Sequence, residues 1–66
     1  MVSEQPTRKV LKLLRSAGWV SGHTVGSHTK WTGPNGMTFS LPDGHRQISP
    51  GVYSKLLKAI KEDEGR

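Results

Sequence analysis

The sequence predicts a small α+β domain in which two helices pack on one face of a three-stranded antiparallel sheet. The predicted order is helix, strand, strand, strand, helix. Leu, Val and Ala recur at helical spacing in an early and a late segment. Between them, Gly, Thr, Val and Trp are frequent and the apolar period falls toward two, which is typical of strands. A chain of 66 residues makes one domain with a small core.

The first helix is predicted over residues 7–17. Its apolar side chains share one stripe, Thr7 is placed to be the N-cap, and Gly18 is placed to end the helix. Most of its polar positions are basic, and they form either a solvated helix face or a set of phosphate contacts. These basic residues are Arg8, Lys9, Lys12 and Arg15.

Three short strands are predicted at residues 19–24, 27–32 and 37–41. The tetrapeptide "GPNG" before the third strand supplies the Pro and Asn-Gly residues of a tight turn. Alternation places Trp31 on one face of the second strand and both His28 and Lys30 on the other. If Trp31 packs toward the helices, His28 and Lys30 face water.

The second helix is predicted over residues 49–62, with Ser49 as N-cap and Pro50 at the first helical position. The acidic residues that follow oppose the helix dipole, so we expect this end to fray. The whole chain, 1–66, is then a single domain with a compact part at about 7–61 and flexible flanks at 1–6 and 62–66. Its bulkiest side chains are predicted to form the core, and they are Trp19, Trp31, Phe39 and Tyr53.

The composition restricts the classes of function. Ten Lys and Arg against five Asp and Glu give a net charge of +5, which favours an anionic partner: nucleic acid first, then acidic protein or anionic lipid. The absence of cysteine excludes disulfides, thiolate catalysis and zinc fingers. No long apolar run or export signal is present, so we expect a cytoplasmic protein that does not enter a membrane.

Several motifs together resemble the HicA family of toxins from toxin-antitoxin systems. They are "AGW" after the first helix, "GSH" at the start of a strand, "PNG" in a hairpin, and "ISPGVYSKLLKAI" in the second helix. The similarity covers about residues 7–61. It implies a fold like that of double-stranded-RNA-binding domains, metal-independent endoribonuclease activity on mRNA, and neutralisation by a HicB antitoxin. The family's Gly-Ser-His motif, with its catalytic histidine, corresponds to Gly26, Ser27 and His28.

One departure from the family concerns a second histidine. The family commonly has it two residues after the proline that ends the third strand, whereas here His45 comes three residues after Pro42. The role of His45 therefore stays open between an RNA contact and a plain loop residue.

The chemistry of RNA cleavage makes His28 a suitable catalyst. RNA carries its own nucleophile, the 2′-hydroxyl, so cleavage needs a base, an acid and cations around the phosphate. An imidazole exists in both protonation states near neutral pH, which suits proton transfer. Lys30 lies on the same strand face and is predicted to hold the phosphate. The other predicted RNA contacts are Gly26, which lets the backbone approach, Ser27, which orients the turn, and His45 and Arg46.

Other interpretations compete with this one. His28 could be an ordinary exposed strand residue, and His23 could be a surface residue or a catalytic helper. A metal site built from the three histidines and Asp43 lacks a recognisable ligand spacing, so no metal or cofactor is predicted. The same fold could bind structured RNA without cutting it, or bind an acidic protein. We expect a monomer when the chain is free.

Overall fold

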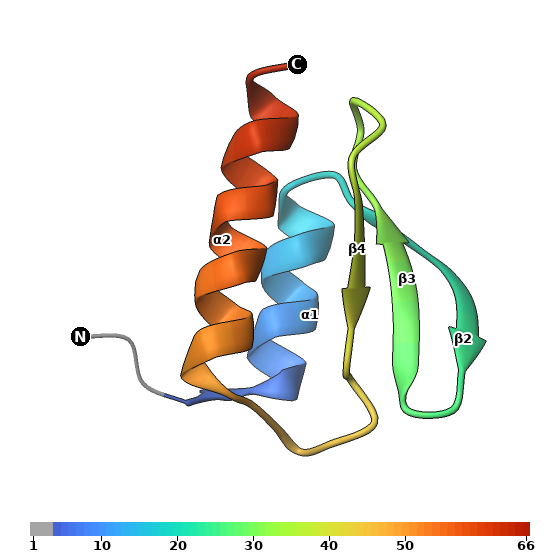
Figure 1. The fold of residues 1–66 in the computed structure, drawn as a ribbon, viewed down its shortest axis with the longest axis vertical. Coiled ribbons are helices and arrows are strands. Elements are labelled where there is room, and N and C mark those ends of the chain that lie inside the picture. Colours follow the sequence, from blue (N-terminus) through green and yellow to red (C-terminus); the bar gives the residue numbers. More distant parts are fainter. Residues whose placement is uncertain (1–3) are drawn as a thin grey trace.

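The computed structural model describes residues 4–66. In it, both helices lie on one side of a three-stranded antiparallel sheet (Figure 1). The helices are α1 (Thr7–Ser16) and α2 (Pro50–Glu64), and the sheet has the order β2 (Val20–Val25), β3 (His28–Thr32), β4 (Thr38–Leu41). The predicted α+β class and element order are therefore confirmed.

A second, two-stranded ladder was not predicted. β1 (Gln5–Pro6) pairs with β5 (Gln47–Ile48) in antiparallel register, with Gln5 opposite Ile48. Strands of two residues are too short to give a period in the sequence. The expected flexible flank 1–6 thus divides into the paired segment Gln5–Pro6 and residues 1–3, which lie outside the described residues.

The predicted N-cap of the first helix is wrong. Pro6 occupies the N-cap position without a side-chain hydrogen bond, and Thr7 is the first helical residue. The Thr7 hydroxyl donates instead to the carbonyl oxygen of His45 at 2.5 Å, and the Thr7 amide donates to the carbonyl oxygen of Arg46 at 2.9 Å. Thr7 is buried, so its polar groups need protein partners, and the β4–β5 loop supplies them.

The predicted end of the first helix at Gly18 and the predicted cap of the second helix at Ser49 are confirmed. Gly18 follows α1 with a φ of +86°, a left-handed conformation that favours glycine after a helix. Ser49 caps α2, and its hydroxyl oxygen accepts a 3.4 Å hydrogen bond from the amide of Val52. Within residues 4–66, no helix is long and apolar enough to span a membrane.

The acidic end of α2 was expected to fray, but α2 continues to Glu64 and Asp63 is only 1% exposed. The Asp63 carboxylate accepts hydrogen bonds from the backbone amides of Asn35 and Met37 in the β3–β4 hairpin. The Asn35 side chain in turn donates to the Asp63 carbonyl oxygen at 2.8 Å. These tertiary hydrogen bonds hold the last turn in place against the unfavourable dipole.

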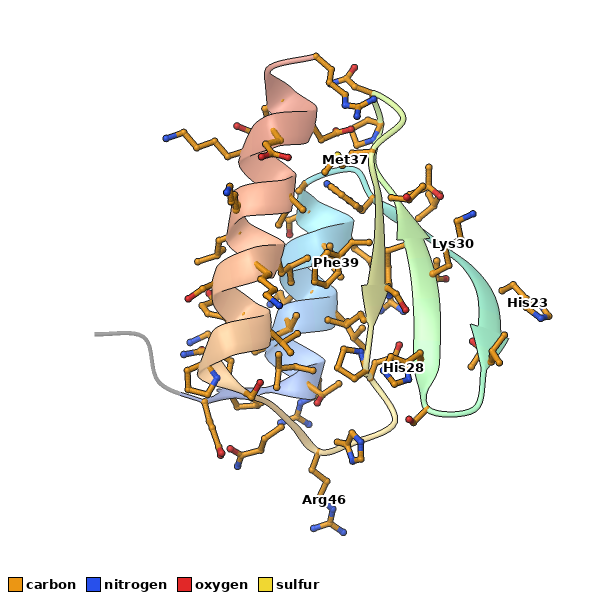
Figure 2. All side chains as sticks on the ribbon, viewed as in Figure 1. His23, His28, Lys30, Met37, Phe39 and Arg46 are labelled. Carbon is orange, nitrogen blue, oxygen red and sulfur yellow. The ribbon has the colours of Figure 1, made fainter. Side chains whose placement is uncertain are left out.

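The core lies between the two helices and the sheet. Trp19 and Trp31 are buried as predicted, whereas Phe39 and Tyr53 are half-buried and pack against the core. Phe39 points from β4 toward the helices (Figure 2). The buried apolar residues are Val10, Leu14, Trp19, Trp31, Leu41, Ile48, Leu56, Ala59 and Ile60.

Candidate functional site

The β2–β3 turn consists of two residues, Gly26 and Ser27. They connect Val25 and His28, which face each other in the ladder. Gly26 has a φ of +60°, and a Cβ built on it would meet nothing within 4 Å. Type II′ hairpin turns need glycine at the first of the two central positions, and Ser27 has no positive φ. The glycine of the Gly-Ser-His motif is thus needed to turn the chain, and it also leaves the space in front of the turn open.

His28 is the first residue of β3, directly after this turn. Its exposed ring lies on the opposite strand face from the buried side chains of Thr29 and Trp31, as predicted. The hydroxyl of Ser27 lies 3.4 Å from Nδ1 of His28, a long and exposed contact. Within residues 4–66, Nε2 of His28 has no partner, so this nitrogen is free to meet a ligand.

The β4–β5 loop packs directly against the β2–β3 turn. The amide of Gly44 donates to the carbonyl oxygen of Ser27 at 2.9 Å. A Cβ on Gly44 would stand 2.6 Å from the Ser27 Cβ and 2.8 Å from its Cα, both well inside van der Waals contact. Only glycine therefore fits at this position without moving the loop or the turn.

Three hydrogen-bonded polar side chains also hold the same loop against the sheet. The buried hydroxyl of Thr29 donates to Oδ1 of Asp43 at 2.9 Å. Because that bond uses the Thr29 proton, Thr24 is the donor in its 3.0 Å bond to the Thr29 oxygen. The row Thr24–Thr29–Asp43 thus connects β2, β3 and the loop next to His28.

The loop brings His45 and Arg46 to the same end of the molecule as His28. Both side chains are exposed, and Arg46 points outward at the end where His28 lies (Figure 2). Thr7 binds the carbonyl oxygens of both residues and so fixes their backbone from the α1 side. His28 lies on one of two segments in contact, and His45 and Arg46 lie on the other, although strand β4 stands between these segments in the sequence.

The other predicted residues lie farther along the sheet. Lys30 is exposed on the same strand face as His28 and pairs with Ser40 across the ladder. His23 lies in the irregular part of edge strand β2, between Ser21 and Thr24, and points away from the sheet (Figure 2). The structure therefore brings His28, His45 and Arg46 to one end and leaves His23 apart from them. Across residues 4–66, no group of three or more His, Cys, Asp or Glu is placed to hold a metal ion.

Sequence reasoning missed the residues that assemble this site. Thr24, Thr29 and Gly44 were interpreted only as strand or turn positions, and Asp43 as a turn residue or a rejected metal ligand. Their contacts join residues up to 17 positions apart. The dipeptide Asp-Gly predicts a turn, but nothing in its pattern indicates which neighbour the turn packs against.

Comparison with known proteins identifies one match. A family model described as "HicA toxin of bacterial toxin-antitoxin" matches residues 7–61. No curated protein and no solved structure matches the chain. The matched segment includes the β2–β3 turn, His28 and the β4–β5 loop.

Proposed function

Because this chain belongs to the family of HicA toxins of bacterial toxin-antitoxin systems, we propose that it is an endoribonuclease that cleaves mRNA and uses His28 for proton transfer. The observation that carries the proposal is the position of His28. Its ring is exposed at the end of the sheet, beside a glycine turn with open space and a loop bearing a second histidine and an arginine. Cleavage would take place in the cytoplasm, where mRNA is found.

The proposed reaction uses only the RNA and the side chains of this site. His28 removes the proton of the 2′-hydroxyl, and the 2′-oxygen attacks the adjacent phosphorus. The bond from phosphorus to the 5′-oxygen breaks, and that oxygen takes up a proton, which leaves a 2′,3′-cyclic phosphate and a 5′-hydroxyl. In this proposal His45 supplies the second proton, and Lys30 and Arg46 offset the phosphate charge. The nucleophile belongs to the RNA, so the proposal includes no metal and no cofactor.

The proposed protein partner is a HicB-like antitoxin that covers the strand face of His28 and Lys30. We propose that the free chain is monomeric. The runner-up function is RNA binding without cleavage by the same fold. The exposed basic residues of α1 favour RNA binding alone, but this function leaves the exposed position of His28 unused.

Incubation of RNA with His28→Ala and His23→Ala proteins tests the proposal. Both histidines are exposed on neighbouring strands, and only His28 lies beside the β4–β5 loop. In excess EDTA, we expect His28→Ala to cut roughly 10²–10⁴-fold more slowly than the parent, because a positioned proton-transfer group contributes about that much. His23→Ala should cut at the parental rate. The free energy of unfolding of both variants should stay within about 0.5 kcal/mol of the parental value.

Three outcomes would contradict the proposal. Equal cutting by His28→Ala and the parent would place the catalyst elsewhere, with His45 next to be tested. RNA that is bound by the parent but left intact would favour the binding module. Activity lost in EDTA and restored by magnesium or zinc would show that a metal ion takes part.

A further inference from the structure

The net charge of this chain is concentrated on one helix. α1 carries Arg8, Lys9, Lys12 and Arg15 and no acidic residue, which accounts for four of the five net positive charges. α2 also carries three lysines, but three acidic residues balance them. An anionic partner attracted by the net charge therefore meets mainly α1. We call the exposed face formed by these four α1 residues the α1 basic surface.

The α1 basic surface breaks two local rules of helix stability. Arg8 and Lys9 occupy the first turn, where the positive end of the helix dipole disfavours cations, and no side chain caps that end. Like charges also stand one turn apart, from Arg8 to Lys12 and from Lys12 to Arg15. Within residues 4–66, none of the four forms an ion pair. Residues that break the local rules of helix stability are expected where a surface has a function.

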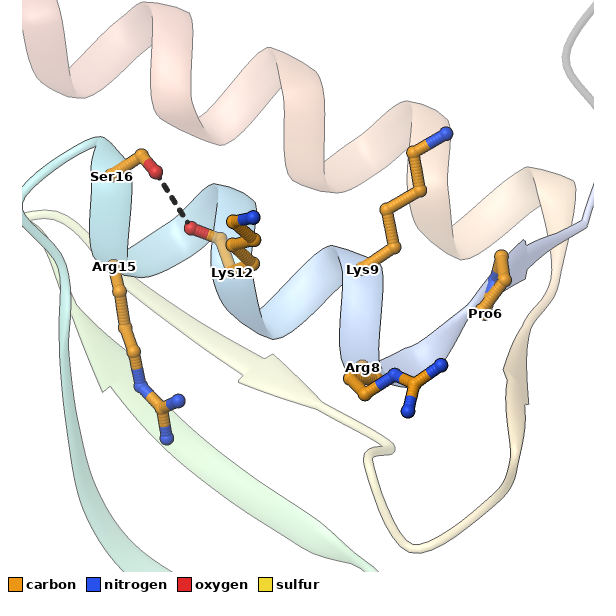
Figure 3. Close-up of a pocket in the computed structure, with 6 residues that line it drawn as sticks. All are labelled: Pro6, Arg8, Lys9, Lys12, Arg15 and Ser16. Carbon is orange, nitrogen blue, oxygen red and sulfur yellow. Dashed lines mark hydrogen bonds between the residues drawn. The ribbon is translucent and has the colours of Figure 1, made fainter.

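The shape of this surface fits an extended ligand. The four cations line one open depression along α1, with Pro6 and Ser16 at its two ends (Figure 3). The Ser16 hydroxyl donates to the carbonyl oxygen of Lys12 at 2.9 Å, so the cationic groups are the main free donors there. The exposed large apolar residues lie elsewhere, at Val20, Val25 and Leu57.

This surface is connected to the candidate site. Thr7, the residue before Arg8, donates both of its hydrogen bonds to the β4–β5 loop at His45 and Arg46. The same loop contacts the turn next to His28 through Gly44. The loop that carries Arg46 thus joins the start of α1 to the end of the sheet where His28 lies.

We propose that the α1 basic surface is a second contact for RNA, which binds phosphates away from the cleaved bond while His28 acts at the end of the sheet. This inference rests on the proposed function. RNA suits the surface better than an acidic protein does. Phosphate backbones need only spaced cations, whereas protein interfaces centre on buried apolar or aromatic side chains, which this surface lacks.

A binding experiment with matched variants tests the inference. Lys12→Gln/Arg15→Gln removes two charges from α1, and Lys55→Gln/Lys58→Gln removes two from the exposed face of α2. The probe is a 2′-O-methyl RNA hairpin, which keeps its phosphates but has no nucleophilic hydroxyl. We expect the α1 variant to bind roughly tenfold more weakly. The negative slope of its log affinity against log salt concentration should become less steep by about two. The α2 variant should stay within about twofold of the parent.

Thermal unfolding separates this effect from a loss of structure. Removing like charges from α1 relieves repulsion, so the α1 variant should melt at or above the parental temperature while it binds RNA less well. Equal weakening in both variants, or none in either, would overturn the inference. Unchanged RNA binding combined with weaker antitoxin binding would assign the surface to an acidic protein and would also overturn it.

The same measurements distinguish this inference from the proposed function. If the parent binds the hairpin through α1 but never cuts ordinary RNA, the inference holds and the proposed cleavage fails. If the parent cuts RNA and the α1 variant binds and cuts as the parent does, cleavage holds and the inference fails.

Discussion

Asp63 joins two parts of the chain that are 28 residues apart. Its buried carboxylate accepts hydrogen bonds from the amides of Asn35 and Met37 at 3.0–3.3 Å. Gly33 lies so close that a Cβ there would stand 2.6 Å from the Asp63 carboxyl carbon. The side chain therefore anchors the β3–β4 hairpin to α2, and Met37 of that hairpin lies at the opposite end of the sheet from His28 (Figure 2).

We predict that Asp63→Ala lowers the free energy of unfolding by about 2–3 kcal/mol, because it leaves two backbone amides without a charged acceptor. Chemical denaturation monitored by tryptophan fluorescence measures this change. The neighbouring carboxylates Glu62 and Glu64 are exposed, so Glu62→Ala and Glu64→Ala serve as controls and should stay within about 0.5 kcal/mol of the parent. A loss in Asp63→Ala no larger than in these controls would show that the hairpin does not depend on this carboxylate.

At the scale of elements, the site depends on contact between the β2–β3 turn and the β4–β5 loop. Each segment has its own local reason for its shape, namely glycine at a turn position in one and Asp-Gly after a strand-ending proline in the other. Their contact depends on Gly44, whose missing side chain lets the loop reach Ser27. Gly44 is thus a positioning residue for the proposed site.

We predict that Gly44→Ala slows RNA cleavage roughly 10–100-fold, because an added methyl group pushes the loop with His45 and Arg46 away from His28. Gly33→Ala is the matched control. It introduces a clash of the same 2.6 Å, against Asp63, at the opposite end of the sheet. Both variants should lose about 1–3 kcal/mol of stability. Cleavage is measured well below both melting temperatures.

Under these conditions, Gly33→Ala should cut RNA at the parental rate. Equal cleavage losses in the two variants would mean that general instability, rather than the loop position, causes the defect. Undiminished cutting by Gly44→Ala would show that the loop does not contribute to the reaction.

At the scale of the whole molecule, charge and shape leave two distinct surfaces available to partners. The open face of the sheet carries His28 and Lys30 and no acidic side chain, whereas the α1 basic surface lies on the helical side. An inhibitor that presents carboxylates to Lys30 would block the proposed site directly. Opposite charges also speed the encounter of two proteins.

We predict that Lys30→Glu weakens binding of a cognate HicB-like antitoxin roughly tenfold, mainly through slower association at low salt. Lys55→Glu on the exposed face of α2 is the control with the same change in charge, and it should bind nearly as the parent does. Surface plasmon resonance at two salt concentrations measures both variants. A structure of the complex in which His28 stays open would reject direct occlusion.

Much of this arrangement was determined by the sequence alone. Helical spacing predicts α1 and α2, and alternation predicts β3 with Trp31 inside and both His28 and Lys30 outside. These features follow from side-chain periodicity within one segment, so a single stretch of chain is enough to predict them. The family resemblance rests on the same local motifs and is confirmed over residues 7–61.

The tertiary structure alone decided which distant residues meet. Thr7 bonds to His45 38 positions away, Asp63 to Asn35 28 positions away, and Thr29 to Asp43 14 positions away. In each case a polar group that local rules assign to a cap, a frayed end or a plain strand position becomes buried by packing and must find a partner. Those partners depend on how the helices and the sheet stack, because periodicity gives the direction of a side chain but not the segment that it faces.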